Sequence, residues 1–358
     1  MLVFIIGTQL LALMTSMMFW WLIKPTQRVS HLSLLFSIFI INNIFLIYGL
    51  SEFWRERFHV YLVISILQGF MLYAGLISAV VAIIYNQILK QTLNPIAIRA
   101  FAVLTYIDIV SLAVFNAYSP VVHQLTIKTD KNLAKPMRIA LVSDTHLGRW
   151  FGNQQIDKMV TLIDEQSPDT VLIAGDVMND STDAYDKTNM HEHLSKLRAP
   201  LGVYATLGNH DYSGNEVAIA KAIERAGIQV IDNKNVWLDD AVLLVGRSDA
   251  TDPNRPVAAD LMADIQTDKP VLFLEHSPEA LTEIQDLPVD LHLSGHTHGG
   301  QIFPLTVVLK WFTPLVYGLK EVNSSQFLVT SGYGIGAVPF RLGTRSEIWI
   351  INLISAQS

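Results

Sequence analysis

Five short polar blocks in this chain of 358 residues carry side chains that can bind a metal ion or transfer a proton. In chain order they are Asp144-Thr-His146, Gly175-Asp176, Gly208-Asn-His-Asp211, Glu275-His276 and Gly295-His-Thr-His298. Carboxylate, amide oxygen and imidazole together suit a transition metal such as Mn, Fe or Zn. The chain has no cysteine and no Gly-x-Ser-x-Gly elbow, so the blocks predict a metal site rather than a nucleophilic cysteine or serine.

The number of donors indicates how many ions the site would hold. Seven side chains are candidate metal ligands: Asp144, His146, Asp176, Asn209, His276, His296 and His298. Seven donors are too many for one tetrahedral ion. They suit two ions that share a bridging carboxylate, and such a pair can activate a water for an in-line displacement. We therefore expect two divalent transition-metal ions, with Mn, Fe or Zn as candidates.

Short apolar runs precede the blocks, and their alternation with amphipathic stretches predicts α/β layers. Strands are predicted at 138–143, 170–174, 203–207, 242–245, 271–274, 291–293, 327–330 and 348–353, and helices at 153–165, 191–197, 216–226, 257–265 and 278–284. The stretch 249–256, rich in Asp and Pro, is expected as a loop. Sites in α/β sheets form at the carboxyl ends of strands, where all five blocks lie.

Charged residues are distributed unevenly along the chain. Residues 1–120 carry 9 charged side chains with a net charge of +3, whereas residues 121–358 carry 48 with a net charge of -10. We therefore expect a membrane region over 1–120, a linker over 121–136 and a catalytic domain over 137–358. The acidic balance of the second part disfavours binding to a phosphate backbone, so no nucleic-acid partner is expected.

Four long apolar stretches lie within the first 120 residues, at 1–23, 31–50, 58–89 and 100–118. Each is long enough to cross a bilayer as a helix, so four transmembrane helices are predicted. A cleaved signal peptide is the alternative for the first stretch, but its length and Trp20-Trp21 beside Lys24 argue against it. Asp108 in the fourth stretch marks an ion or substrate pathway, or else it faces the bundle interior or the membrane interface.

Basic residues in the connectors predict the orientation of the membrane region. Connectors one and three contain Lys24, Arg28, Lys90 and Arg99, and connector two contains Arg55 and Arg57. The positive-inside rule then places the catalytic domain outside the cytoplasm. The basic residues at 128, 131, 135 and 138, just after the last span, favour the opposite orientation.

From about residue 135 to the C-terminus, the order and spacing of the blocks resemble the calcineurin-like metallophosphoesterase superfamily. The tail Val329-Thr-Ser-Gly-Tyr-Gly-Ile-Gly336, with Pro339-Phe-Arg-Leu-Gly343, is similar to a bacterial membrane-associated phosphohydrolase branch. That branch includes predicted phosphodiesterases and a UDP-2,3-diacylglucosamine pyrophosphatase. The resemblance implies a four-layer αββα metallophosphoesterase sandwich that follows the transmembrane helices. It also implies a metal-dependent phosphoric ester hydrolase, integral to the bacterial inner membrane.

The resemblance further implies a role for each block. Asp144, His146 and His298 would hold the first metal, Asn209, His276 and His296 the second, and Asp176 would bridge them. His210 would contact the scissile phosphate and protonate the leaving oxygen, and Asp211 would orient His210. Relatives have an acidic or amide residue three positions after the bridging aspartate; here that residue is Asn179, followed by Asp180.

The apolar stretch 303–317 directly follows the histidine pair and predicts a lid, an interfacial element or ordinary packing. With Trp150 and Phe151 it would form an apolar entrance for a lipid-linked phosphoester. We expect a phosphoester or pyrophosphate substrate, with a phospholipid or a nucleotide-sugar lipid as candidates, cleaved by a metal-activated water. The alternative is a membrane transport or sensing protein that uses the metal domain as a regulatory module without catalysis.

Overall fold

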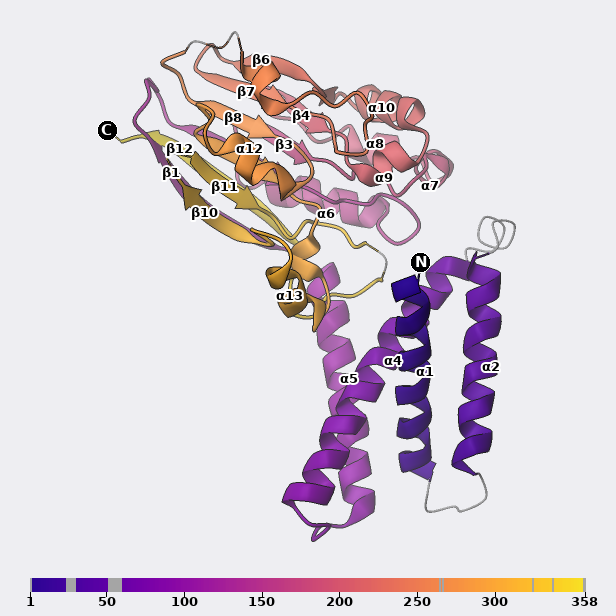
Figure 1. Cartoon of the computed structure of the whole chain (residues 1–358). Helices are drawn as coiled ribbons and strands as arrows, with labels where there is room; N and C mark the ends of the chain where they lie inside the picture. Colours follow the sequence, from indigo (N-terminus) through magenta and orange to yellow (C-terminus); the bar gives the residue numbers. More distant parts are fainter. Residues whose placement is uncertain are drawn as a thin grey trace. The chain divides into compact units, whose positions relative to one another are not determined.

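The computed structural model describes residues 2–23, 30–50, 60–263, 265, 267–323, 325–336 and 338–356. The chain divides into two compact units, residues 1–114 with 337–339 and residues 115–336 with 340–358. Figure 1 shows helices in the first unit and layered sheets and helices in the second. We refer to them as the helical unit and the sheet unit.

The helical unit contains α1 (Leu2–Ile23), α2 (His31–Leu50), α4 (Val60–Ile83) with its π-helical continuation η2 (Ile84–Ile88), and most of α5 (Pro95–Tyr118). Gln9 and Asn43 join α1 to α2 through two reciprocal side-chain hydrogen bonds of 2.9 and 3.0 Å. Such amide pairs link helices whose surroundings offer few other polar partners.

Helices of 22, 20, 24 and 24 residues lie where four transmembrane spans were expected. Among the described residues, two stretches are long and apolar enough to cross a membrane, Gln68–Ile88 and Pro95–Tyr118. Asp108 is exposed on α5, so it does not face the interior of the helical unit. The connector residues Lys24, Arg28, Arg55 and Arg57, on which the expected orientation depends, lie outside the described residues.

Two six-stranded mixed sheets form the frame of the sheet unit (Figure 1). The first has the order β1-β12-β2-β3-β4-β5, and the second has the order β10-β11-β9-β8-β7-β6. In chain order the strands are β1 (Val121–Thr129), β2 (Met137–Val142), β3 (Thr170–Ala174), β4 (Val203–Thr206), β5 (Gln229–Val230), β6 (Lys234–Leu238), β7 (Val242–Gly246), β8 (Val271–Leu274), β9 (Leu291–Ser294), β10 (Gly318–Val322), β11 (Ser325–Val329) and β12 (Glu347–Ser355). The strands that lead into the five polar blocks are parallel within each sheet, so their carboxyl ends share an edge.

Three apolar cores make the sheet unit four layers deep. The first sheet is covered by the helices α6 (Asn153–Asp164), α8 (Met190–Leu194) and α10 (Glu216–Arg225). A second core fills the space between the two sheets. The second sheet is covered by α11 (Ala258–Met262) and α12 (Leu281–Ile284). Alternate residues of one strand serve different cores: Val142 of β2 faces the helices, and Leu141 faces the other sheet. Both faces of each central strand are therefore apolar, and the expected αββα layering is present.

The edge strands are where the sequence-based expectation was wrong. Residues 121–129, expected as part of a linker, form β1, which pairs in parallel with β12. The other strands that the sequence pattern did not predict are β5, β6 and β10, and all four are edges of the two sheets. Edge strands are short or half solvent-exposed, so they lack the continuous apolar runs that identify the central strands.

Candidate metal centre

The polar blocks occupy the loops that follow β2, β3, β4, β8 and β9, and several of these loops have unusual backbone conformations. Asp144, His146, Asp176, His296 and His298 have φ values of 53°, 44°, 51°, 69° and 49°. The left-handed region costs a residue other than glycine about 1–3 kcal/mol. Backbone hydrogen bonds of 3.0 Å from Asp144 to Gly175 and from His146 to Asp176 hold the turns in place. The fold thus fixes the directions of these side chains at an energetic cost.

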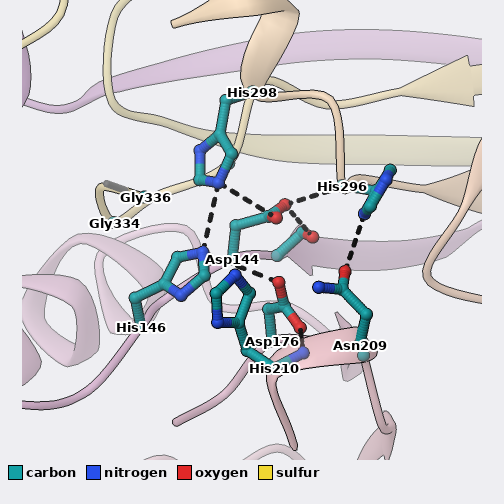
Figure 2. Close-up of polar contacts among 12 residues, drawn as sticks. Asp144, His146, Asp176, Asn209, His210, His296, His298, Gly334 and Gly336 are labelled. Atoms are coloured by element: carbon teal, nitrogen blue, oxygen red, sulfur yellow. Dashed lines mark hydrogen bonds and ion pairs between the residues drawn. The ribbon is translucent and has the colours of Figure 1, made fainter. Parts of the chain in front are cut away.

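The side chains of Asp144, His146 and His298 point toward one another (Figure 2), and their ligand atoms all lie within 4.8 Å. The Nε2 atoms of His146 and His298 are 3.1 Å apart. Nε2 of His298 is 3.4 Å from Oδ1 of Asp144. We call these three residues the first ligand group.

A second ligand group consists of Asn209, His276 and His296. Oδ1 of Asn209 lies 2.8 Å from Nδ1 of His296 and 3.1 Å from Nε2 of His276, and the two nitrogens are 3.2 Å apart. Nδ1 of His276 donates to the carbonyl oxygen of Ala174 at 2.8 Å. Because that bond fixes the proton on Nδ1, Nε2 of a neutral His276 is free to bind a cation.

Asp176 lies between the two groups. Its Oδ2 is 3.6 Å from Nε2 of His146 and 3.2 Å from Nε2 of His276. Its Oδ1 accepts a hydrogen bond of 2.9 Å from the backbone N–H of His210. A Cβ at Gly208 would lie 2.2 Å from Oδ1 of Asp176, so only glycine fits there. The structure thus brings all seven predicted ligands together and puts Asp176 where a shared carboxylate would be needed.

The donor set fits divalent cations on two observations. Ligand atoms about 2.1 Å from a metal lie about 3.0–3.4 Å apart in octahedral or tetrahedral coordination. The nitrogen–nitrogen separations within the two groups, 3.1 and 3.2 Å, match this spacing. In addition, Oδ1 of Asp144 is buried with no hydrogen-bond partner among the described residues, and a bound cation would satisfy it.

The electrostatics of the site favour ionised carboxylates. Burial opposes ionisation of Asp176, but the neighbouring imidazoles, His276 first, lower its pKa below the ordinary value. Burial likewise disfavours the charged form of His276, yet Asp176 raises the pKa of His276 to about 10. Without metal, a proton on His276 therefore supplies the positive charge that Asp176 needs, and a metal ion must displace that proton.

His210 is supported by a different aspartate from the one expected. Nδ1 of His210 lies 2.7 Å from Oδ1 of Asp180. Asp211 instead accepts the backbone N–H groups of Val177 and Gly208 at 3.0 Å and of Met178 at 2.9 Å. Asp211 is the third residue of the short helix α9 (Asn209–Ser213), and its carboxylate turns back toward the start of that helix. The prediction that Asp211 orients His210 is therefore wrong, and Asp180 makes that contact.

The position of Asp180 has a consequence for the charge of His210. Burial alone would lower the pKa of His210, but the hydrogen bond to Asp180 and the charge of Asp176 outweigh it and raise the pKa above the ordinary value of 6.5. With its proton on Nδ1 held by Asp180, a charged His210 presents a second proton on Nε2. The sequence signal for Asp180 was its place four residues after Asp176.

Arg341 is a further residue beside the site to which the sequence analysis assigned no role. It is fully buried, and its Nη2 lies 3.1 Å from Nδ1 of His298. The same nitrogen donates to the carbonyl oxygens of Gly332 and Gly334 at 3.2 and 2.6 Å. Burial, together with the Arg341 charge and against the pull of Asp144, lowers the pKa of His298 to about 3. His298 is therefore uncharged, as a metal ligand must be.

Comparisons with known proteins agree with this geometry. Residues 137–300 match the family model of the calcineurin-like phosphoesterases. An uncharacterized metallophosphoesterase of Campylobacter jejuni is 29% identical, over 93% of this chain and 92% of its own length. A transmembrane protein with metallophosphoesterase domain from Danio rerio is 31% identical over 62% of this chain and 54% of its own length. A metallophosphoesterase of Bacillus subtilis is 29% identical over 61% of this chain and 79% of its own.

The two mixed sheets and the cluster of seven donors at the strand ends fit the class of protein that the family model describes, a calcineurin-like phosphoesterase. Residues 137–300 carry a calcineurin-like phosphoesterase domain, and the similarity to proteins named metallophosphoesterases supports a phosphoric ester hydrolase. The finer resemblance to the UDP-2,3-diacylglucosamine pyrophosphatase branch stays a prediction.

Proposed function

We propose that the protein is a membrane-anchored phosphohydrolase that holds two divalent metal ions and hydrolyses a phosphoester or pyrophosphate. One observation carries the two-ion proposal: Oδ2 of Asp176 lies 3.6 Å from a nitrogen of the first ligand group and 3.2 Å from one of the second. A carboxylate oxygen between two sets of donors is what a pair of ions about 3.5–4 Å apart requires.

The chain supplies most of the groups that this reaction needs. In the hydrolysis a water oxygen attaches to phosphorus, the bond from phosphorus to the leaving oxygen breaks, and the leaving oxygen takes up a proton. Two bound divalent ions would polarise the phosphoryl oxygens and lower the pKa of the attacking water. Nε2 of His210 would donate the proton to the leaving oxygen while Asp180 holds its Nδ1 at 2.7 Å.

His210→Ala tests the assignment of the proton donor. The variant is expected to lower kcat by about 10²–10⁴-fold and to keep the metal content of the wild type. A ring nitrogen of His210 lies within 4.8 Å of ligand atoms of His146 and Asp176, but both ligand groups and Asp176 stay intact in the variant. The readouts are hydrolysis of bis-p-nitrophenyl phosphate and elemental analysis of the same sample. Wild-type turnover by the variant, or wild-type hydrolysis that survives exhaustive chelation, would refute the proposed reaction.

We further propose that the four helices of the helical unit span the membrane and place the sheet unit outside the cytoplasm. Two described helical stretches have the length and composition of membrane spans, and the number of spans and the orientation rest on the sequence pattern. The chain has no cysteine, so Trp237→Cys on β6, where the native side chain is 46% exposed, gives a single reporter thiol. Labelling of intact cells by an impermeant maleimide is expected; labelling only after lysis would reverse the orientation.

A further inference from the structure

An apolar surface follows the metal-binding histidines directly. Seven large apolar side chains between Phe303 and Leu319 are exposed: Phe303, Leu305, Val307, Trp311, Phe312, Tyr317 and Leu319. Trp311 and Phe312 are 75% and 77% exposed, the largest values among them. The other exposed large apolar residues beyond residue 120, such as Trp237 and Val257, stand apart from one another in the sequence. We call residues 303–319 the apolar segment.

The apolar segment contains regular secondary structure. It contains the helix α13 (Leu305–Val308) and the 3₁₀ turn η5 (Leu309–Trp311), and neither of them buries a side chain. Its start is fixed by a hydrogen bond of 2.7 Å from the Phe303 N–H to the carbonyl oxygen of Leu342. A contiguous stretch of apolar side chains left in solvent indicates a surface that another apolar phase covers.

The charges along the segment favour a lipid surface as that phase. From residue 291 to residue 320 the sequence contains no carboxylate, although residues 121–358 carry a net charge of -10. Lys310 and Lys320 are the only charged side chains in that stretch. The Tyr317 hydroxyl donates a hydrogen bond of 3.0 Å to the buried carboxylate of Glu347. Aromatic residues flanked by lysine, in a stretch of sequence without carboxylates, are typical of elements that lie at the headgroup level of a bilayer.

The segment also borders the end of a candidate membrane helix. Residues 341–346 hydrogen-bond to both: Leu342 accepts from Phe303, and the Ser346 N–H donates to the carbonyl oxygen of Asn116 in the last turn of α5 at 3.0 Å. Nε of Arg345 donates to the carbonyl oxygen of Ser119 at 2.7 Å. The apolar segment is therefore linked through residues 342–346 to the residues at the end of α5 and directly after it.

Both ends of the segment are connected to the metal centre. Its start lies five residues after His298 in the sequence. Near its other end, the carbonyl oxygen of Val316 accepts a hydrogen bond of 2.6 Å from Oγ1 of Thr297, the residue between His296 and His298. A phosphoester whose apolar tails lie along the segment would therefore have its phosphate close to the ligand loop.

We propose that the apolar segment lies in the headgroup region of the membrane and presents lipid phosphoesters to the metal centre. This inference rests on the proposed phosphohydrolase function and names the substrate class as a phosphate ester embedded in a bilayer.

Spin labelling tests the membrane contact without reference to activity. Because the chain has no cysteine, Phe312→Cys and Trp237→Cys each place one nitroxide on the full-length protein in phosphatidylcholine–phosphatidylglycerol vesicles. The label at 312 is expected to relax with lipid-soluble oxygen, and the label at 237 with a water-soluble nickel chelate. A label at 312 that contacts the chelate as readily as the one at 237, or that is shielded from both reagents by protein, would overturn the proposal.

Hydrolysis of two esters with the same leaving group tests the substrate class. The Trp311→Ser/Phe312→Ser double variant is expected to lose about tenfold or more in kcat/KM for a p-nitrophenyl phosphatidyl ester in vesicles. It is expected to keep the wild-type value for bis-p-nitrophenyl phosphate within about twofold. An equal loss on both esters, or wild-type hydrolysis of the soluble ester alone, would contradict the proposal. Failure of the wild type on both esters would instead count against the phosphohydrolase function, and the spin labels would still report the membrane contact.

Discussion

The two ligand groups of the metal centre reach similar spacings by different means. In the first group Asp144, His146 and His298 all have left-handed backbones. In the second group only His296 does; Asn209 begins a helix, and the ring of His276 is fixed by a hydrogen bond to the carbonyl oxygen of Ala174. All three residues of the first group therefore lie in strained turns, whereas the second group combines one strained turn, the start of a helix and a ring fixed by a hydrogen bond. The shared residue Asp176 is the point at which the two depend on each other.

The largest expected effect comes from removing that shared residue. Asp176→Asn takes away the charge that both groups face, so both ions are expected to be lost and kcat/KM to fall by at least about 10³-fold. Elemental analysis and hydrolysis of bis-p-nitrophenyl phosphate provide the measurement. Two ions per chain in this variant would show that Asp176 is not shared.

Removing one ligand from each group tests whether the groups are separate sites. His298→Ala and His276→Ala are each expected to leave about one ion per chain and to lower kcat by about 10²-fold or more, because a single ion cannot clamp both reacting oxygens. The readout is the number of ions per chain in each variant. Hydrolysis by the same samples is the control, and both variants are expected to lose activity to a similar extent. If either variant lost both ions, the division into two groups would be wrong.

Metal removal measures how far the ions offset the strain in the turns. Ions that bind only the folded chain stabilise it by about 2.7 kcal/mol at a concentration of 100 times Kd. Chelation is therefore expected to lower Tm, and less so in Asp176→Asn, which has no ions to lose. An unchanged Tm for the chelated wild type would mean that the turns keep their shape without any ion.

Asp211 and Asp180 are two aspartates near His210 with different contacts: Asp211 accepts backbone N–H groups, and Asp180 contacts the His210 ring. Asp211→Asn places an amide N–H against backbone donors, and it is expected to lower the free energy of unfolding by about 1–3 kcal/mol. Because Asp211 does not contact the His210 ring, the pH profile of kcat is expected to keep its shape. A displaced profile in this variant would restore the role first expected for Asp211.

Asp180→Asn is expected to have the smallest effect, and only on pH dependence. His210 must be protonated to donate, and Asp180 helps to raise its pKa above 6.5, so activity is retained up to that raised pKa and falls as the pH rises through it. Without the carboxylate the pKa of His210 drops, and the alkaline limb of the kcat profile moves to lower pH. A limb that stays in place would mean that Asp180 does not set the charge of His210.

The sequence predicted the central strands and the residues of the centre because both have strong local signals. Continuous apolar runs identify strands such as β3 and β8, and the polar blocks stand at their ends. The edge strand β1 was missed because its outer residues are polar. The partner of His210 was missed because Asp211 is its neighbour in the sequence, whereas Asp180 lies 30 residues away and meets the ring only in the folded chain.

Membrane insertion is predicted from hydropathy and length, whereas the metal centre is predicted from residue types and their spacing. Helices occupy the four expected stretches. Among the described residues, two helical stretches have the length and composition of a membrane span. An apolar stretch can form a helix with or without a bilayer, so the helix alone does not show membrane insertion. Seven converging polar donors are costly to bury unless they bind a partner such as a metal ion.

Elemental analysis of the purified full-length protein tests the central claim most directly. Wild-type chain purified with Mn²⁺ and freed of excess metal is expected to contain two divalent ions, and Asp176→Asn none. A wild-type chain that holds no ion, or as many as the variant, would contradict the dinuclear centre and the reaction derived from it.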